Sequence, residues 1–363
     1  MIERLRQQMN PVGASTVDAG AVEPVSPLLE VRDLTVDITM DESTVHAVRG
    51  VSFAISAGEM VALVGESGCG KSITALSLMG LSRQIPGAHV GGHIFFRPRK
   101  QLHHGSDSVG VDSVIDVVAA PLGSLRHLRG NEIGIIFQDP MSSLNPVFSV
   151  GQQIMEPLLL HRQMTRREAQ REAVRLLRIA GVSEPEQRFY QYPHQLSGGM
   201  RQRVMISMAL SCRPSLLLAD EPTTALDVTI QAQIMHLLLR LRQEFGSAVM
   251  LITHDLSIVA GTCSRVLVMY AGKLVEMAAA REFFYHPRHP YSRALMDSLP
   301  RVDIKRELKS IPGQPPDLTS PPPGCPFAPR CPRARDVCRE EMPPLEALGT
   351  AVVACHFPLE TGA

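Results

Sequence analysis

A glycine-rich octapeptide constrains the fold of this chain more than any other feature. It reads Gly65-Glu66-Ser67-Gly68-Cys69-Gly70-Lys71-Ser72, which fits the pattern G-x-x-x-x-G-K-[ST]. The apolar run MVALV before it is typical of a buried strand, and SITALSLMGL after it is typical of a helix. Glycines let the backbone curl so that its N–H groups point at phosphate oxygens, and a helix N-terminus adds positive partial charge. Together these features predict an α/β fold that binds a nucleotide.

The side chains of this loop have separate expected roles. We expect Lys71 to neutralise charge on the β- and γ-phosphates and Ser72 to offer its hydroxyl to Mg²⁺. Cys69 is interpreted as a small filler. The alternative is a glycine-rich turn with a chance lysine, but the flanking strand and helix favour nucleotide binding.

A second acidic motif lies further along the chain. The segment SLLLADE is an apolar run that ends in Asp220 and Glu221. A central strand presents such carboxylates at its C-terminal edge, where ligands bind in doubly wound sheets. We expect Asp220 to hold Mg²⁺ and Glu221 to polarise an attacking water. Two acids could also merely begin a turn, but the phosphate loop upstream favours the functional interpretation.

Composition narrows the class of protein. The 363 residues carry 36 Lys and Arg against 36 Asp and Glu, a balance that disfavours a general nucleic-acid binder. No window of 18 apolar residues is free of charge, so the chain is not expected to span a bilayer by itself. Residues 1–27 lack a signal-peptide core and are interpreted as a flexible lead-in. We therefore expect a cytosolic protein that reaches a membrane only through other subunits.

The pattern along the chain predicts further elements. Alternating residues from Leu28 predict strands, and residues 165–180, 199–211 and 230–245 predict helices. Buried strands are expected at SLLLAD and AVMLITH, and a hairpin should turn at residues 271–273. The segment 311–323 contains six prolines and is interpreted as an extended linker.

The segment Leu196-Ser197-Gly198-Gly199-Met200 resembles the signature motif of ATP-binding-cassette ATPases, with Met200 where glutamine is usual. Ser197 and the glycine N–H groups would cap a helix and form an anion site without a lysine. The resemblance implies that this site completes the γ-phosphate pocket of a partner subunit. Hydrolysis would then need two subunits arranged head to tail.

Other motifs of that family follow in order. Gln138 matches the Q-loop, Ala225-Leu226-Asp227 the D-loop, and His254 the switch histidine. The resemblance covers residues 28–280 and implies a mixed central sheet, an antiparallel β subdomain and a helical subdomain. It implies catalytic roles for Glu221, His254 and Gln138, and Mg²⁺ contacts for Ser72, Gln138 and Asp220. ATP contacts would come from the octapeptide and from Gln138, Ser197, Gly198, Gly199, Asp220 and Asp227.

One position departs from the family pattern. The family usually places an aromatic ring before the phosphate loop to stack on adenine, and Ile38 lies near that place. The segment between Leu28 and Val51 contains no Tyr, Phe or Trp. We therefore expect apolar contact to hold the base, with less selectivity than stacking.

Four segments resemble the ATPases of oligopeptide and dipeptide importers: FQDPMSSLNPVFSVGQQI, DEPTTALDVTIQAQI, HPRHPYSRAL and GCPFAPRC. The resemblance implies two permease subunits, a second identical or homologous ATPase and an extracytoplasmic peptide-binding protein, with this chain on the cytoplasmic face of the cell membrane. Nickel and sugar importers share parts of the pattern. A soluble cassette ATPase acting on DNA or ribosomes is a further alternative, disfavoured by a single cassette without a coiled-coil insertion.

The expected C-terminal extension, residues 281–363, contains a cysteine cluster: Cys325, Cys331, Cys338 and Cys355. In a reducing compartment such a cluster suggests a metal sooner than disulfides. Its spacing, C-x5-C-x6-C-x16-C, lacks the C-x2-C pairs common in zinc sites. The resemblance implies that some relatives carry a [4Fe–4S] cluster, which we expect here ahead of zinc. Free thiols are the alternative, and a redox protein with an idle nucleotide site is disfavoured by Glu221 and His254.

Overall fold

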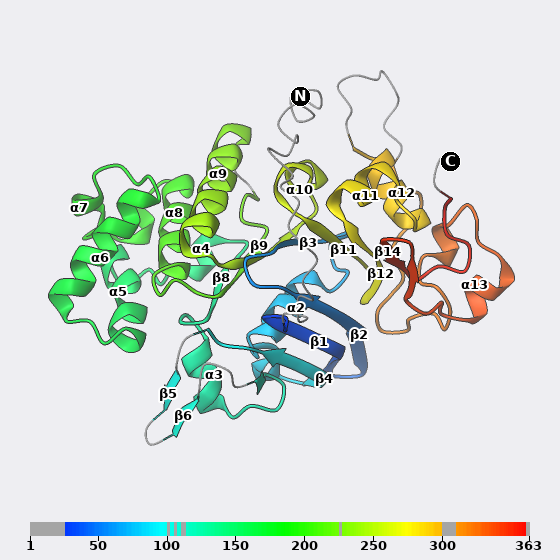
Figure 1. The fold of residues 1–363 in the computed structure, drawn as a ribbon, viewed down its shortest axis with the longest axis horizontal. Coiled ribbons are helices and arrows are strands. Elements are labelled where there is room, and N and C mark those ends of the chain that lie inside the picture. Colours follow the sequence, from blue (N-terminus) through cyan, green and yellow to red (C-terminus); the bar gives the residue numbers. More distant parts are fainter. Residues whose placement is uncertain are drawn as a thin grey trace, which may run out of the picture.

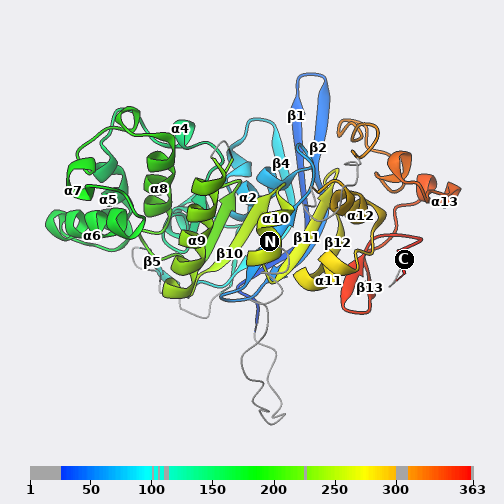
Figure 2. The same cartoon turned by 90° about the horizontal axis from the view of Figure 1, so that it is seen from above.

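The structure is a computed structural model that describes residues 26–99, 102–104, 107–109, 114–224, 227–299 and 310–360. Its centre is an eight-stranded sheet with the order β13-β14-β12-β11-β3-β10-β9-β8. A smaller antiparallel sheet lies against one face, a helical lobe lies at one end and the C-terminal extension at the other (Figures 1 and 2). This arrangement confirms the predicted fold class.

The parallel strands of the large sheet are short and buried. They are β3 (Met60–Val64), β8 (Ile133–Ile136), β9 (Leu216–Asp220), β10 (Ala248–Thr253) and β11 (Arg265–Tyr270). β3 pairs in parallel with β10 on one side and β11 on the other. Alternate β3 residues enter different cores, with Val61 and Leu63 facing the small sheet. The C-terminal ends of β3, β9 and β10 therefore meet at one edge, where the candidate site lies.

The antiparallel sheet has the order β2-β1-β4-β7. Its strands are β1 (Leu29–Met40), β2 (Ser43–Ile55), β4 (Ala88–Phe96) and β7 (Ile115–Asp116). The fully buried Val36 and Val48 are paired across β1 and β2 and share a core with Leu78 of α2 (Lys71–Leu78). The two sheets thus enclose the helix that follows the phosphate loop. Outside this core, β5 (Leu102–His104) and β6 (Asp107–Val109) form a two-stranded ribbon, and α3 (Leu122–Leu128) and the 3₁₀ turn η1 (Ser82–Gln84) line the smaller sheet.

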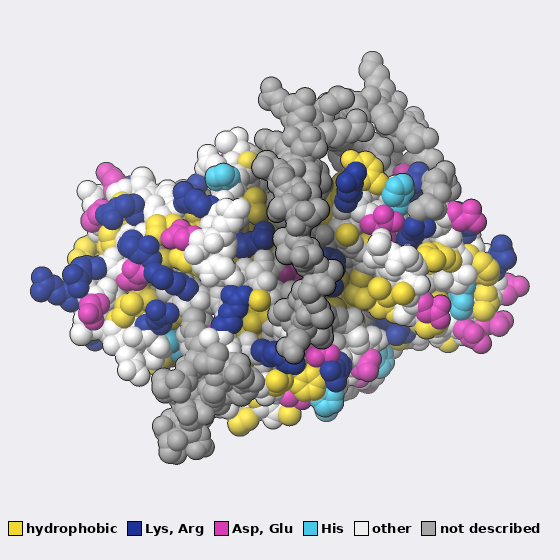
Figure 3. Space-filling model, in the orientation of Figure 1, with side chains coloured by type: hydrophobic (Ala, Val, Ile, Leu, Met, Phe, Trp, Pro, Cys, Tyr) yellow, Lys and Arg dark blue, Asp and Glu magenta, His cyan; other side chains and the backbone are white. Residues whose placement is uncertain are grey.

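The helical lobe has its own core. It contains α4 (Pro140–Ser143), α5 (Val150–His161), α6 (Arg166–Ile179), α7 (Pro185–Arg188), the turn η2 (Pro193–Gln195) and α8 (Gly198–Ala209). Capping boxes begin α5 at Ser149 and α6 at Thr165, because each N-cap side chain and the Gln or Glu three residues on satisfy each other's backbone N–H groups. The outer face of α6 carries arginines, and arginine side chains, drawn in dark blue, stand out on this lobe in Figure 3.

The last helices of the cassette cover the other face of the large sheet. They are α9 (Val228–Phe245), α10 (Leu256–Thr262) and α11 (Ala280–Tyr285). β11 turns into β12 (Lys273–Ala279) through Ala271, which has a φ of 47°, and Gly272. The predicted hairpin is therefore confirmed, as are the three predicted helices and the two predicted buried strands.

The C-terminal extension packs beside the same sheet. It includes α12 (Pro290–Asp297), η3 (Ala328–Arg330), α13 (Asp336–Glu340), β13 (Glu346–Leu348) and β14 (Ala351–Val353). β14 pairs with β12, so the extension adds two strands to the main sheet. Phe327 packs with Tyr270 and Tyr291 in the core under it. Most of the predicted lead-in, residues 1–27, lies outside the described residues.

Candidate nucleotide site

The phosphate loop joins β3 to α2. Gly65 and Gly70 mark its ends, with φ angles of 157° and 104°. A Cβ on Gly65 would lie 2.2 Å from the Met269 carbonyl oxygen, and one on Gly70 would lie 2.3 Å from that of Ala47. Neighbouring backbone thus excludes any side chain at both positions. Gly70 also has the left-handed conformation that glycine adopts at little cost.

Lys71 folds back over this loop. Its side chain is buried, and Nζ donates hydrogen bonds to the carbonyl oxygens of Gly65 (3.0 Å) and Glu66 (2.8 Å). The ammonium is therefore held against the backbone of the phosphate loop, as expected of a phosphate partner. Burial raises the pKa of the nearby Cys69 thiol, which agrees with an inert filler.

Asp220 ends β9 beside the hydroxyl of Ser72. Burial raises the pKa of its carboxyl group, while the Ser72 hydrogen bond and the Lys71 charge oppose that rise. Its Oδ1 is buried and has no hydrogen-bond partner. A buried carboxylate oxygen left unpaired next to a hydroxyl is a donor set that suits Mg²⁺, which prefers hard oxygen ligands. These residues therefore fit the cation predicted from the sequence.

The structure brings together three residues that were predicted to be catalytic. Glu221 accepts hydrogen bonds from Nε2 of Gln138 (3.0 Å) and from Nδ1 of His254 (3.0 Å), the latter with Nδ1 protonated. Thr224 donates a third from its hydroxyl (2.8 Å). The backbone of Glu221 has a φ of 45°, an uncommon conformation for a non-glycine residue. One carboxylate therefore links the ends of β8, β9 and β10.

The hydrogen bonds around Glu221 decide its charge. Burial alone would raise the pKa of its carboxyl group, but hydrogen bonds from His254 and Thr224, with the positive charges of His254 and Lys71, lower it overall. An ionised carboxylate can accept a proton or a hydrogen bond from water. His254 is mostly exposed, with 63% of its side chain accessible, whereas only 12% of the Glu221 side chain is accessible.

The signature motif begins α8 in the helical lobe. Ser197 caps the helix by accepting a hydrogen bond from the Met200 N–H (3.4 Å). Both Ser197 and Gly198 are exposed, and a Cβ on Gly198 would meet nothing within 4 Å. In both ribbon views α8 lies apart from α2 (Figures 1 and 2). Within this chain, the signature and the phosphate loop therefore do not form one pocket.

Asp227 caps α9 through hydrogen bonds from the N–H groups of Thr229 and Ile230, both at 3.0 Å. The neighbouring Val228 is 81% exposed. Ala225 and Leu226, the other D-loop residues, lie outside the described residues. The Asp227 carboxylate is thus occupied by its own helix and does not reach the phosphate loop.

The chain matches the family described as "ABC transporter" over residues 48–224. It also matches "Oligopeptide/dipeptide transporter, C-terminal region" over residues 275–338. The oligopeptide transport ATP-binding protein OppD of Salmonella typhimurium is 49% identical over 342 residues, covering 94% of this chain and 96% of that protein. The dipeptide transport ATP-binding protein DppD of Bacillus subtilis is 48% identical over 317 residues, covering 87% and 90%.

The chain belongs to the ABC transporter family. A solved dimeric ATP-binding cassette in a post-hydrolysis state, bound to ADP and Pi, has a similar fold. Its TM-score is 0.59 at 27% identity, and the match covers 70% of this chain and 99% of that chain. Membership confirms the family, the ATP-binding cassette and the ATPase activity that the motifs predicted.

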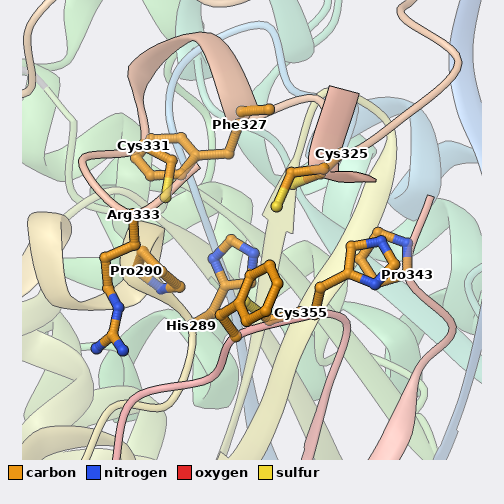
Figure 4. Close-up of a pocket in the computed structure, with 12 residues that line it drawn as sticks. His289, Pro290, Cys325, Phe327, Cys331, Arg333, Pro343 and Cys355 are labelled. Carbon is orange, nitrogen blue, oxygen red and sulfur yellow. The ribbon is translucent and has the colours of Figure 1, made fainter. Parts of the chain in front are cut away.

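The prediction that this ABC subunit holds an iron–sulfur cluster is wrong, and so is the alternative prediction of zinc. Among the described residues, which include all four tail cysteines, no three His, Cys, Asp or Glu side chains are placed to hold a common metal. The four cysteines border one small pocket with Phe327, Pro290 and Pro343, as Figure 4 shows in part. His356, next to Cys355, forms a hydrogen bond with the Glu341 carbonyl through Nε2 at 3.1 Å.

The physical reason lies in the surroundings of the thiols. Burial raises the pKa of the Cys325 and Cys331 thiols, and it raises that of Cys355 to about 11. The thiols lie among apolar side chains around the pocket, and among the described residues no three of them are placed to hold one metal. Burial also lowers the pKa of the adjacent His289 to about 3, so its imidazole is neutral in this pocket. The cysteines instead pack as small apolar side chains.

Three residues that contact the site were not foreseen from the sequence. Thr224 donates a hydrogen bond to Glu221. Its position three residues after Glu221 is the sequence signal that could have indicated this contact. Tyr291 accepts a hydrogen bond from the Glu66 N–H (2.8 Å), and Arg330 pairs with the Glu66 carboxylate. These last two lie more than 200 positions away in the sequence, and no spacing rule points to them.

Proposed function

We propose that this chain is the ATP-hydrolysing subunit of a peptide importer, driving transport of dipeptides or oligopeptides. The observation that carries the proposal is its near-complete alignment with peptide-transport ATP-binding proteins, including the oligopeptide/dipeptide C-terminal region. That region distinguishes this branch, because the cassette motifs themselves serve ABC ATPases with many substrates.

The site geometry supports a specific division of work. The octapeptide N–H groups and Lys71 bind the phosphates, and Glu221 orients and polarises the attacking water. His254 and Gln138 hold Glu221 through its two carboxylate oxygens. Because Glu221 stays ionised, its carboxylate can accept a proton from the attacking water.

Ser72 and Asp220 would hold Mg²⁺, with Gln138 completing the site. The cation would neutralise charge that develops on the phosphates. The unpaired Oδ1 of Asp220 is the observation that favours this role. The ion would also offset the burial that raises the pKa of Asp220.

Ser197, Gly198 and Gly199 would complete the nucleotide site of a second ATPase, and Asp227 would lie at that interface. The exposed N-terminus of α8, where the signature motif lies, supports this arrangement. A helix N-terminus attracts anions, and the nucleotide in the chain's own phosphate loop would lie too far away to use this one. Each of the two composite sites would then contain residues from both subunits.

The remaining partners follow from the same proposal. Two permease subunits would span the membrane, and an extracytoplasmic peptide-binding protein would deliver substrate. This chain would bind the cytoplasmic face as a peripheral subunit, with the cassette at 28–280 and the extension at 281–363. Among the described helices, none has both the length and the apolar composition needed to cross a membrane.

Reconstitution in proteoliposomes tests the proposal. The chain, its second ATPase, its two permeases and its binding protein should together take up a radiolabelled oligopeptide only with internal MgATP. A matched assembly with Glu221→Gln should bind peptide but not transport it. Uptake of nickel or a sugar, with no peptide uptake, would favour the alternative importers. ATP hydrolysis that no permease alters would favour a soluble cassette ATPase.

A further inference from the structure

The C-terminal extension contacts the phosphate loop directly. Arg330, at the end of η3, forms a two-pronged ion pair with Glu66, the second residue of the loop. Its Nη1 lies 2.6 Å from one carboxylate oxygen and its Nη2 lies 3.0 Å from the other. Only 5% of the arginine side chain is exposed, whereas 24% of the Glu66 side chain is. Two parallel bonds of this kind fix orientation as well as distance.

Arg330 also ties two further segments to this ion pair. Its Nε donates to the Pro312 carbonyl (2.8 Å), and its Nη2 donates to that of Ile311 (3.2 Å). Its Nη1 lies 3.1 Å from the hydroxyl of Tyr270 at the end of β11. A single guanidinium thus joins the phosphate loop, the main sheet and the start of the proline-rich linker.

The linker runs from this ion pair across the site. We call residues 311–318 the strap. Pro315, Pro316 and Leu318 of the strap face the loop residues Glu66–Cys69 across a small pocket. The strap then reaches β2, where the carbonyl of Leu318 accepts a hydrogen bond from the His46 N–H (2.9 Å). The strap therefore bridges the phosphate loop and the antiparallel sheet.

The extension holds Glu66 at its backbone too. The N–H of Glu66 donates to the hydroxyl of Tyr291, a fully buried residue of α12. Glu66 contributes its own carbonyl to Lys71. Glu66, which receives both contacts from the extension, is therefore hydrogen-bonded to Lys71, the proposed phosphate-binding lysine.

We propose that Arg330 is a positioning residue of the ATP site, and that the strap and Arg330 couple the C-terminal extension to the conformation of the phosphate loop. This inference rests on the proposed role of that loop in ATP binding. Arg330 does not touch nucleotide in this proposal; it acts through Glu66. Coupling of this kind is reciprocal, so nucleotide in the loop must also tighten the strap.

The first test is a double-mutant cycle on the full chain, with MgATP affinity measured by calorimetry. Arg330→Gln and Glu66→Gln should each weaken MgATP binding by about tenfold, as expected for groups in direct contact. The double variant should be no weaker than either single variant. The matched control is Arg339→Gln, which breaks an exposed ion pair with Asp336 in the same extension and should leave affinity unchanged.

A purely structural Arg330 would give a different result. Arg330→Gln would then lower the melting temperature but bind MgATP with wild-type affinity, and this outcome overturns the proposal. If Arg330→Gln does not fold, Arg330→Lys replaces it, because lysine keeps the charge and loses the two-pronged geometry. That variant should still weaken MgATP binding, and unchanged affinity would again overturn the proposal.

Hydrogen exchange provides the reciprocal measurement. MgATP should slow amide exchange in residues 311–318 of the wild type and have a smaller effect in Arg330→Gln. At the same MgATP concentration Lys71→Ala should show far less protection, since it should bind nucleotide about 10²-fold more weakly. If wild type binds MgATP and the strap exchanges at the same rate with and without it, the coupling is wrong while the ATP site stands. If Lys71→Ala binds MgATP normally, the proposed ATP site itself is wrong.

Discussion

The two helix N-termini that we propose bind phosphate, at α2 and α8, differ in what surrounds them. At α2, the loop is enclosed by its own chain: a Cβ on Gly70 would strike the Ala47 carbonyl, and Lys71 is buried over the loop. At α8, Ser197 and Gly198 are exposed and the space beside Gly198 is open. The first is therefore closed in by its own chain, and the second is open to another molecule. The contrast indicates why one subunit binds ATP but two are expected to hydrolyse it.

The largest effect on MgATP binding should come from a substitution at the enclosed N-terminus of α2. Lys71→Ala should weaken MgATP binding by about 10²-fold, because the triphosphate loses a charge-assisted partner. Calorimetry on the isolated chain measures this, with Arg171→Ala on the exposed face of α6 as a control that should keep full affinity. Undiminished affinity in Lys71→Ala would break the distinction between the two ends.

Glu221→Gln should separate binding from hydrolysis. We expect turnover in the assembled transporter to fall by about 10²- to 10⁴-fold, since the amide cannot act as a base. MgATP affinity of the isolated chain should stay within about twofold. Phosphate release and calorimetry measure the two quantities, and an active Glu221→Gln assembly would remove this residue from the mechanism.

A pair of glycine substitutions sharpens the comparison between the ends. Gly198→Ala fits the space beside α8, so the isolated chain should keep its melting temperature and MgATP affinity. The assembled transporter should lose most of its hydrolysis, because the added methyl group would meet the partner's nucleotide. Gly70→Ala should instead impair binding in the isolated chain, since its Cβ clashes with backbone and its φ is 104°.

Mixed assemblies extend that test. If the two ATPases are identical, combining Gly198→Ala chains with Lys71→Ala chains restores one intact composite site in each mixed pair, and some hydrolysis should return. A transporter with two different ATPases should show no such rescue. Normal hydrolysis by Gly198→Ala alone in the assembled transporter would contradict the shared-site arrangement.

The smallest expected effect concerns the thiols of the extension. With a pKa of about 11, about one Cys355 in a thousand is ionised at pH 8, so alkylation should be far slower than for a free cysteine. Mass spectrometry after iodoacetamide treatment measures this, with free cysteine in the same solution as the reference. Labelling should accelerate as pH rises toward 11. Rapid modification at pH 8 would show that burial does not control these thiols.

Sequence reasoning worked best where the chemistry is local. The phosphate loop, the acidic end of β9 and the caps at Ser197 and Asp227 each involve residues within a few positions of one another. Their geometry follows from strand, turn and helix rules that act over that range. The meeting of Gln138, Glu221 and His254 also follows, because each comes at or just beyond the end of a parallel strand of one sheet.

Sequence reasoning failed where the outcome depends on packing between residues far apart in the chain. Cysteine spacing alone does not encode whether the thiols sit among apolar rings or converge on a metal, and here Phe327 and the prolines decide. The contacts of Arg330 and Tyr291 with Glu66 span more than 200 residues. β13 and β14 have three residues each, too few for a periodic pattern to show that they would join the main sheet.

The pairing of β14 with β12 has a consequence for any shortened form of the chain. A chain ending near residue 280 would keep the cassette motifs but leave β12 as an unpaired edge, with backbone N–H and C=O groups facing water. Uncovered edges of this kind recruit strands from other molecules. The ring of Tyr270, which packs against Tyr291 and Phe327 of the extension, would be bared as well. Such a protein would be expected to self-associate. By covering β12, the two short strands β13 and β14 would therefore also help to keep the chain soluble.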